Sequence, residues 1–132
     1  MTRVRKLFRD KMEDYKARAE AVRQAEVFEG AFAISVCPAE NVESPTVVGA
    51  QAANELLDIV GIKASVVLSQ FNGTVYLSAR SIDEVNVQVM MEKLGGGGHR
   101  TIAGAQLKDT TIEEAIEKVK TVIRQMLEKG DL

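Results

Sequence analysis

The hydrophobic and polar positions of this chain follow two periods, one helical and one alternating, and the chain begins with the helical one. From residue 2 to about residue 26, charges of both signs separate apolar residues that recur three, four or multiples of these apart. This spacing predicts a long amphipathic helix with one apolar stripe. The helix is either an ordinary first helix or a connector from a preceding domain. The stripe consists of Val4, Phe8, Tyr15, Ala19 and Val22.

Four shorter segments, rich in apolar, β-branched and aromatic residues, predict β-strands. The first of them is closed by Cys37-Pro38, because the residue before a proline and the proline itself disfavour continued pairing. The second and third flank Asn72-Gly73, a typical type I′ turn sequence, so they are expected to pair as an antiparallel hairpin. The predicted strands are residues 32–36, 63–71, 74–81 and 103–108.

Capping residues predict two helices between these strands. Ser44-Pro45 supplies an N-cap and a proline at the first helical position, which opens a helix that runs to about residue 60 and stops at Gly61. Residues 81–94 return to helical spacing, with Ser81 or Asp83 as the cap. A run of glycines follows this helix directly.

A last amphipathic helix begins after Thr110 or Thr111 and ends near Gly130. The resulting order, α, β, α, β, β, α, β, α, predicts an α/β fold with a mixed β-sheet covered by helices. We expect a long N-terminal connector helix over residues 1–28 and one domain over residues 29–132. The buried face of the last helix is predicted to be Ile112, Ala115, Ile116, Val119, Val122, Ile123 and Met126.

The composition fits one such domain and limits the classes of partner that it can bind. Of the 132 residues, 45% are hydrophobic, which is enough for a single core. Seventeen basic and nineteen acidic residues leave a net charge of −2, which argues against broad adhesion to nucleic acid or to an acidic membrane. The one cysteine excludes an internal disulfide, and no apolar stretch reaches the roughly 20 residues that span a bilayer. We therefore expect a cytoplasmic domain.

The most informative motif is Gly95-Gly96-Gly97-Gly98 followed by His99, the one histidine of the chain. Glycine loses more conformational freedom on folding than any other residue, so four in succession indicate that bare backbone is needed there. Consecutive N–H groups in a tight loop form a concave, partially positive site that suits a phosphate, with His99 as a further donor. A helix cap would explain one glycine, a plain connector is the alternative for the run, and His99 can equally be a structural or surface residue.

A cation near this loop is also expected. The predicted helix 81–94 ends in the loop, and a helix C-terminus carries partial negative charge that repels a phosphate. Along the strand 74–81, Ser78 and Arg80 share one face and can converge on a ligand. An arginine at a strand end can equally be a solvated edge charge. Asn86, early in the following helix, is a further candidate.

Catalytic machinery is not predicted in this chain. Metal-dependent hydrolysis of phosphate esters needs a cluster of carboxylates and histidines, but this sequence has one histidine, and its acidic residues are spread along helix faces. Cys37 ends an apolar strand and is predicted to be a buried structural thiol. The residues therefore indicate binding of an anion and not its hydrolysis.

Four motifs, taken in order, resemble the DHH-associated domain of type one. They are Ser78-Ala79-Arg80-Ser81, Val85-Asn86-Val87, the glycine run with its histidine, and Ala103-Gly104. Essentially the whole chain is similar to the C-terminal end of phosphodiesterases of the GdpP type, which open cyclic-di-AMP to the linear dinucleotide. In that family the domain follows a DHH domain, which holds manganese ions and the catalytic Asp-His-His cluster.

The resemblance implies a role for each candidate residue. Arg80 and His99 would hold the substrate phosphate, the backbone of residues 95–98 would line it, and Ser78 would support the arginine side. The implied partners are a cyclic dinucleotide or short linear oligonucleotide and a preceding DHH domain of the same parent chain. The resemblance further implies a membrane-anchored parent, manganese in the DHH domain and no cofactor in this chain. A homodimer through the first helix is a further expectation.

The alternative is a nucleic-acid-binding module of a DHH-family exonuclease or oligoribonuclease. Similar domains accompany such nucleases and alanyl-tRNA synthetase. Phe71 and Tyr76 are the aromatic residues near the candidate site, and the charge balance is acidic. The chain therefore offers little stacking platform or basic track for a long strand. The first expectation is a domain that binds the substrate phosphate of a metal-dependent cyclic-di-AMP phosphodiesterase.

Overall fold

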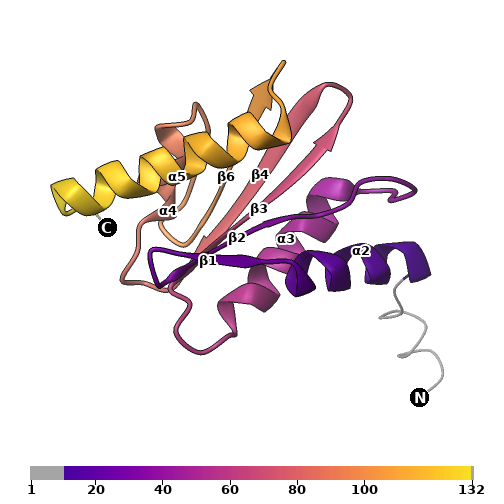
Figure 1. The fold of residues 1–132 in the computed structure, drawn as a ribbon, viewed down its shortest axis with the longest axis horizontal. Coiled ribbons are helices and arrows are strands. Elements are labelled where there is room, and N and C mark those ends of the chain that lie inside the picture. Colours follow the sequence, from indigo (N-terminus) through magenta and orange to yellow (C-terminus); the bar gives the residue numbers. More distant parts are fainter. Residues whose placement is uncertain (1–10, 132) are drawn as a thin grey trace.

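The computed structural model describes residues 11–131. In this part of the chain, six strands form one sheet in the order β1-β2-β3-β4-β6-β5. Helices α2 and α3 lie on one face of the sheet and α4 and α5 on the other, as Figure 1 shows. The predicted α/β class with a mixed sheet is confirmed. The elements are α2 (Met12–Arg23), β1 (Glu26–Phe28), β2 (Phe32–Val36), α3 (Pro45–Leu57), β3 (Ala64–Phe71), β4 (Thr74–Ser81), α4 (Val87–Glu92), β5 (Gly97–Gly98), β6 (Ile102–Lys108) and α5 (Ile112–Lys129).

The topology follows from two connections. Strands β2 and β3 are parallel, and α3 supplies the crossover that a parallel pair requires. Strands β3 and β4 form the predicted hairpin, in which Asn72 and Gly73 have φ values of 53° and 73°, the left-handed pair that a type I′ turn needs. Strand β4 then pairs with β6, and β6 with β5, both antiparallel.

Helix α5 closes one face of the sheet as its sequence predicts. Thr111 and Glu114 form a capping box at its start, and Gly130 ends it with a φ of 72°. Five residues of the predicted face are buried and two are partly buried against the same core. The buried residues are Ala115, Val119, Val122, Ile123 and Met126; the partly buried ones are Ile112 and Ile116.

The opposite face, which we call the α3 face, is lined by small residues where the helices cover it. The Ser65 hydroxyl donates to the Ala53 carbonyl oxygen at 2.7 Å, and the Ser35 hydroxyl donates to that of Ala21. A Cβ on Gly49 of α3 would lie 3.2 Å from Ser69 Oγ. Small side chains thus let α2 and α3 approach β2 and β3 closely, and serine hydroxyls satisfy their polar atoms on helix carbonyls.

Two helix boundaries differ from the sequence prediction. The helix predicted over residues 81–94 covers only Val87–Glu92, because Ser81 is the last residue of β4 and donates its hydroxyl to the Val85 carbonyl oxygen at 2.6 Å. The cap is therefore Asn86 and neither Ser81 nor Asp83. Helix α3 begins at Pro45 as predicted but ends at Leu57, because bonds between residues three apart tighten its last turn.

The first helix also differs. Residues 2–10 of the predicted segment lie outside the described part, and α2 ends at Arg23. Its buried residues are Ala17 and Ala21, whereas Tyr15 and Ala19 of the predicted stripe are exposed. Val22 of the predicted stripe is partly buried against the same core, but the prediction was wrong at Tyr15 and Ala19, because α2 packs mainly through alanines, which a search for large apolar residues passes over. No helix within residues 11–131 is long and apolar enough to cross a membrane.

Two short strands were not predicted, and both lie at edges of the sheet. Strand β1 pairs with β2, and its Phe28 ring lies beneath the Lys120 and Arg124 cations of α5, at 5.6 and 4.9 Å. Strand β5 is the Gly97–Gly98 pair of the glycine run and pairs with β6. Strand β1 has only three residues, too few to show an alternating pattern, and the two glycines of β5 have no side chains to alternate.

Candidate functional site

The α3 face of the sheet is covered over β2 and β3, partly covered by α3 over β4, and open over β6. Positions that face α3 on β3 are buried, on β4 they are half-buried, and on β6 most are exposed. We call the positions of this face on β4 and β6, which are half-buried or exposed, the open strip. It consists of Tyr76, Ser78 and Arg80 of β4 and Ile102, Gly104, Gln106 and Lys108 of β6. Because side chains alternate along a strand, these residues share one face, as predicted for Ser78 and Arg80.

A cleft of ≈ 680 Å³ lies along this strip, between the start of α3 and the glycine run. Three of the predicted site residues line it: Ser78, Gly95 and Gly96. The other lining residues are Thr46, Tyr76, Leu77, Gly104, Ala105, Gln106 and Lys108.

The floor of the open strip is bare backbone. Ser78 of β4 lies opposite Gly104 of β6, and Gly104 lies opposite Gly97 of β5. Directly opposed residues point to the same face of a sheet, so this cross-strand row carries one hydroxyl and then two positions without side chains. A flat ligand can approach the backbone here as closely as van der Waals contact allows.

Arg80 stands on the same strip and is held by α3. Its Nε donates to Asn54 Oδ1 at 3.1 Å, and its Nη1 donates to the Ala79 carbonyl oxygen at 2.8 Å. Partial burial lowers the pKa of Arg80 from its ordinary value, but a guanidinium keeps its charge at neutral pH. Arg80 is therefore a fixed cation at the rim of α3 and not a free edge charge, which answers the alternative left open by the sequence.

His99 lies near Arg80, with Ile102 between them. Arg80 is opposite Ile102 in the β4–β6 ladder, and the His99 N–H donates to the Ile102 carbonyl oxygen at 2.7 Å. Since neighbouring strands lie about 5 Å apart, the backbones of Arg80 and His99 are about 10 Å apart. The His99 residue is exposed. Both side chains are thus long enough to reach one phosphate placed over Ile102.

Part of the expected row of free N–H groups is already bonded within the fold. Gly95 and Gly96 donate to carbonyl oxygens in the last turn of α4, at 3.0 and 2.8 Å, and His99 donates to Ile102. The first two bonds are a Schellman motif that ends the helix. The glycine run therefore shapes a helix end and a hairpin, and these three N–H groups are used within the fold.

Three of the four glycines are required by the fold itself. Gly95 has a φ of 85° and Gly98 one of 143°, values that side chains disfavour. A Cβ on Gly96 would lie 2.1 Å from the Gly104 carbonyl oxygen, and one on Gly98 would lie 2.6 Å from Cα of Ala103. The missing side chains of Gly96 and Gly98 thus let the backbone of β6 come close. The sequence alone had predicted that a ligand comes close at these positions.

Gly97 is the exception. Its φ lies outside the left-handed region, and a Cβ there would meet no atom within 4 Å. No packing requirement within residues 11–131 explains the missing side chain. Gly97 lies on the cross-strand row of Ser78 and Gly104, so its bare backbone extends the floor of the open strip.

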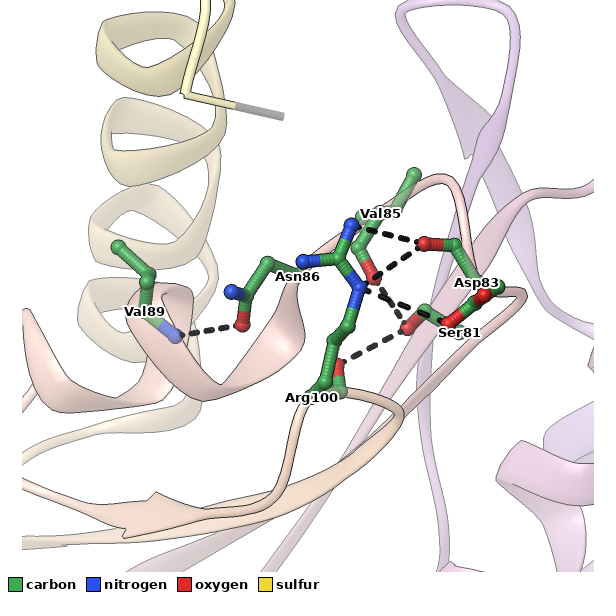
Figure 2. Close-up of polar contacts among 6 residues, drawn as sticks. All are labelled: Ser81, Asp83, Val85, Asn86, Val89 and Arg100. Atoms are coloured by element: carbon green, nitrogen blue, oxygen red, sulfur yellow. Dashed lines mark hydrogen bonds and ion pairs between the residues drawn. The ribbon is translucent and has the colours of Figure 1, made fainter.

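Asn86 is not brought into the cleft. Its Oδ1 accepts from the Val89 N–H at 3.2 Å, which caps α4 (Figure 2). Beside it, Arg100 Nε and Nη2 donate to the Asp83 carbonyl oxygen at 3.0 and 2.9 Å. The Arg100 carbonyl oxygen in turn accepts from the Val87 N–H at 2.9 Å. These contacts tie the turn that follows His99 to the segment between β4 and α4.

Several residues of the site were missed by sequence reasoning. Gln106 and Lys108 could have been placed beside Ser78 by the alternation along the strand that contains Gly104. Thr46 and Asn54 come from α3, and no local signal connects that helix to the glycine run. Their positions depend on how α3 crosses the sheet.

Three other features of the described residues do not indicate a second functional site. A hollow of ≈ 530 Å³ lies between α2 and the loop after β2, and no predicted site residue lines it. Within residues 11–131, no group of three or more His, Cys, Asp and Glu side chains is placed to hold a metal ion. Cys37 is buried, and burial raises its pKa to about 11, so the thiol stays protonated at neutral pH.

Comparison with known proteins identifies the family. The model of the DHHA1 domain matches residues 30–129. The chain belongs to the DHHA1 domain family. This agrees with the resemblance found in the sequence, and the GdpP and PdeA phosphodiesterases that the chain is similar to are DHH-family enzymes.

Two curated relatives are cyclic-di-AMP phosphodiesterases. GdpP of Geobacillus thermodenitrificans is 42% identical over 96% of this chain and 19% of its own length. PdeA of Listeria monocytogenes is 38% identical over 91% of this chain and 18% of its own length. The chain thus spans about a fifth of these relatives. An exopolyphosphatase-related protein from Bacteroides fragilis has the same fold, with a TM-score of 0.80 and 17% identity over 92% of this chain and 37% of its own.

Proposed function

We propose that this DHHA1 domain binds the nucleotide phosphate of the substrate in a metal-dependent cyclic-di-AMP phosphodiesterase. The observation that carries the proposal is the open strip: Ser78 and Arg80 of β4 and the glycine run come from two segments of the chain and lie along one partly uncovered face beside a cleft. The two phosphodiesterase relatives supply the substrate class.

The chemistry of the strip suits a phosphodiester. Arg80 presents a charge whose position is fixed by Asn54, and His99 lies on the far side of Ile102. A phosphate above Ile102 would accept from both side chains, and hydrogen bonds to an ionised group are about twice as strong as neutral ones. The bare backbone of Gly97 and Gly104 leaves room for the sugar-phosphate to lie flat. These residues orient the scissile phosphate and offset its negative charge.

Cleavage itself is assigned to a preceding DHH domain of a membrane-anchored parent chain. The manganese ions expected there would supply the hydroxide that attacks phosphorus. The residues described here bind and position the ester, so removing this domain would weaken substrate capture and turnover. The proposed place of the domain is the cytoplasmic side of the membrane, where it closes over the substrate from the other side.

A titration followed by amide chemical shifts tests the proposal. The ligands are cyclic-di-AMP, linear di-adenylate and a longer oligoadenylate. We expect saturable shifts from both short ligands, centred on Ser78, residues 95–99 and residues 102–108. Affinity that rises with oligonucleotide length and falls steeply with salt would instead support the nucleic-acid-binding alternative. Silence with every ligand would overturn the proposal.

Matched variants separate a site from incidental charge. Arg80→Ala and His99→Ala should each weaken cyclic-di-AMP binding at least tenfold while the fold is retained. Arg124→Ala is the control, because Arg124 is an exposed arginine of α5 on the other face of the sheet. Equal losses in all three variants would indicate nonspecific attraction of an anion.

A further inference from the structure

We infer that the half of the cleft between Gly104 and Lys108 is a purine subsite selective for adenine, formed by Tyr76 and Gln106. This inference rests on the proposed function, because it takes the phosphate end of the strip as given. It adds that the other end of the cleft recognises the base, and this addition is argued from the positions of residues on β4 and β6.

The first observation is position. Tyr76 lies opposite Gln106 in the β4–β6 ladder, and both line the cleft. Gln106 lies four residues along β6 from Ile102, where the phosphate is placed, which corresponds to about 13 Å of strand. A nucleotide whose phosphate lies at the Arg80 end therefore directs its base toward Tyr76 and Gln106.

The second observation is a preformed aromatic platform. The Tyr76 ring stacks on Phe71 with ring centroids 4.3 Å apart and an interplanar angle of 14°. This stack fixes the Tyr76 ring before any ligand arrives. A half-buried, immobilised ring at the wall of a cleft is the arrangement that stacks on a base with little loss of side-chain entropy.

The third observation is an amide without a partner in the described structure. The Gln106 side chain is exposed and takes part in no hydrogen bond within residues 11–131. A carboxamide offers one acceptor and one donor edge together. Adenine presents a donor at N6 beside an acceptor at N7, so the two groups pair twice, whereas guanine presents two acceptors there. Gln106 thus favours adenine over guanine.

Lys108 and Thr46 complete the far end of the cleft. Lys108 is exposed, lies next to Gln106 on the open strip and forms no ion pair within residues 11–131. Thr46 contributes from the first turn of α3. These groups suit the sugar and second phosphate of a dinucleotide and supply no discrimination between bases.

The test is the ratio of dissociation constants for linear di-guanylate and linear di-adenylate, measured on this chain by calorimetry or fluorescence. The two ligands carry the same phosphates, so the contribution of Arg80 and His99 cancels in the ratio. The wild-type chain should prefer di-adenylate by about 5- to 150-fold, the range for one bidentate base contact. Gln106→Leu should bring the ratio to near one, and Gln125→Leu on the exposed face of α5 should leave it unchanged.

Tyr76 has a separate signature. Tyr76→Leu should weaken both dinucleotides by about 5- to 150-fold with little change in their ratio, because stacking does not read base identity. Tyr76→Phe keeps the ring and its stack on Phe71, and should bind as the wild type does, which guards against a folding defect. Tyr15→Leu is the matched control on α2.

The two proposals fail in different ways. A wild-type chain that binds both dinucleotides equally, or a ratio that survives Gln106→Leu, overturns the adenine subsite and leaves the phosphate site standing. Failure of every dinucleotide to bind, or binding unaffected by Arg80→Ala, overturns the proposed function itself.

Discussion

The covered and open parts of the α3 face are built on the same sheet but use their residues in opposite ways. On β3, Ser65, Val67 and Ser69 face α3 and are at most 2% exposed. On β6, two strands away, Ile102 is 52% exposed on the same face. One half of this face therefore contributes to folding, and the other half is free to contact a ligand.

The difference arises from the width of the helical layer. Helices α2 and α3 pack on one another and on β2 and β3, where alanines and serines allow a close approach. No helix within residues 11–131 continues this layer over β6 and β5. Substitutions in the two halves should consequently affect different quantities, stability in the covered half and ligand binding in the open strip.

The largest effect is expected for Leu56→Ala in the covered half. Leu56 of α3 is fully buried in the core of the covered half, so its truncation should lower the free energy of unfolding by about 2–5 kcal/mol. Gln106→Ala in the open strip should change stability by less than about 0.5 kcal/mol. Urea denaturation measures the free energy of unfolding of both variants. Similar losses of stability at the two sites would contradict the distinction between the covered half and the open strip.

Gly96→Ala tests the division within the glycine run. The added methyl group would collide with the backbone of β6, so β5 must shift and stability should fall by about 1–3 kcal/mol. The neighbouring Gly97→Ala meets open space and should leave the melting temperature unchanged or slightly raised. Thermal unfolding of both variants checks this, and an equal drop would show that Gly97 is also a folding residue.

Asn54→Leu tests how Arg80 is positioned. The variant removes the acceptor for Arg80 Nε, and binding of cyclic-di-AMP should weaken about 3- to 10-fold, since one hydrogen bond contributes about 1 kcal/mol. In the Arg80→Ala background, Asn54→Leu should have no further effect. Additive losses in that double variant would show that Asn54 acts independently of Arg80.

A pH dependence from Cys37 in the covered half is expected only at high pH. Burial raises its pKa from the ordinary 9.0 to about 11, so the thiolate forms more readily in the unfolded chain. The stabilisation is complete below pH 9 and falls by about 1.4 kcal/mol per pH unit as the pH rises toward 11. Relative to Cys37→Ala, the wild type should lose about 2 kcal/mol over this range in urea denaturation. A constant difference at every pH would contradict it.

The sequence predicts the central strands and the last helix better than the edge of the sheet at β5, for physical reasons. The strand 32–36, the hairpin around Asn72-Gly73 and the last helix follow from local spacing and turn chemistry, and all three are confirmed. Residues 81–94 mislead because Ser81, although a good cap, pairs with Ala64 as the last residue of β4, and its hydroxyl donates to the Val85 carbonyl oxygen. Edge strands such as β5 carry no pattern, since glycine has no side chain to alternate.

The site residues divide in the same way. Alternation along one strand places Ser78 and Arg80 on a common face, and the structure confirms that relation. The purpose of the glycines could not be read locally, because Gly96 and Gly98 are required by contacts with β6, and Gly95 by the end of α4. Only the assembled sheet shows that Gly97 is the glycine of the run whose missing side chain is not required by packing.

Gly97→Val offers the most direct test of the claim that the open strip is the nucleotide site. Valine suits a strand, and the Cβ at this position has no neighbour within 4 Å, so the fold should be retained while the side chain stands on the floor of the strip. The account predicts an unchanged melting temperature and at least tenfold weaker binding of cyclic-di-AMP by calorimetry. A stable variant that binds cyclic-di-AMP with wild-type affinity would contradict it.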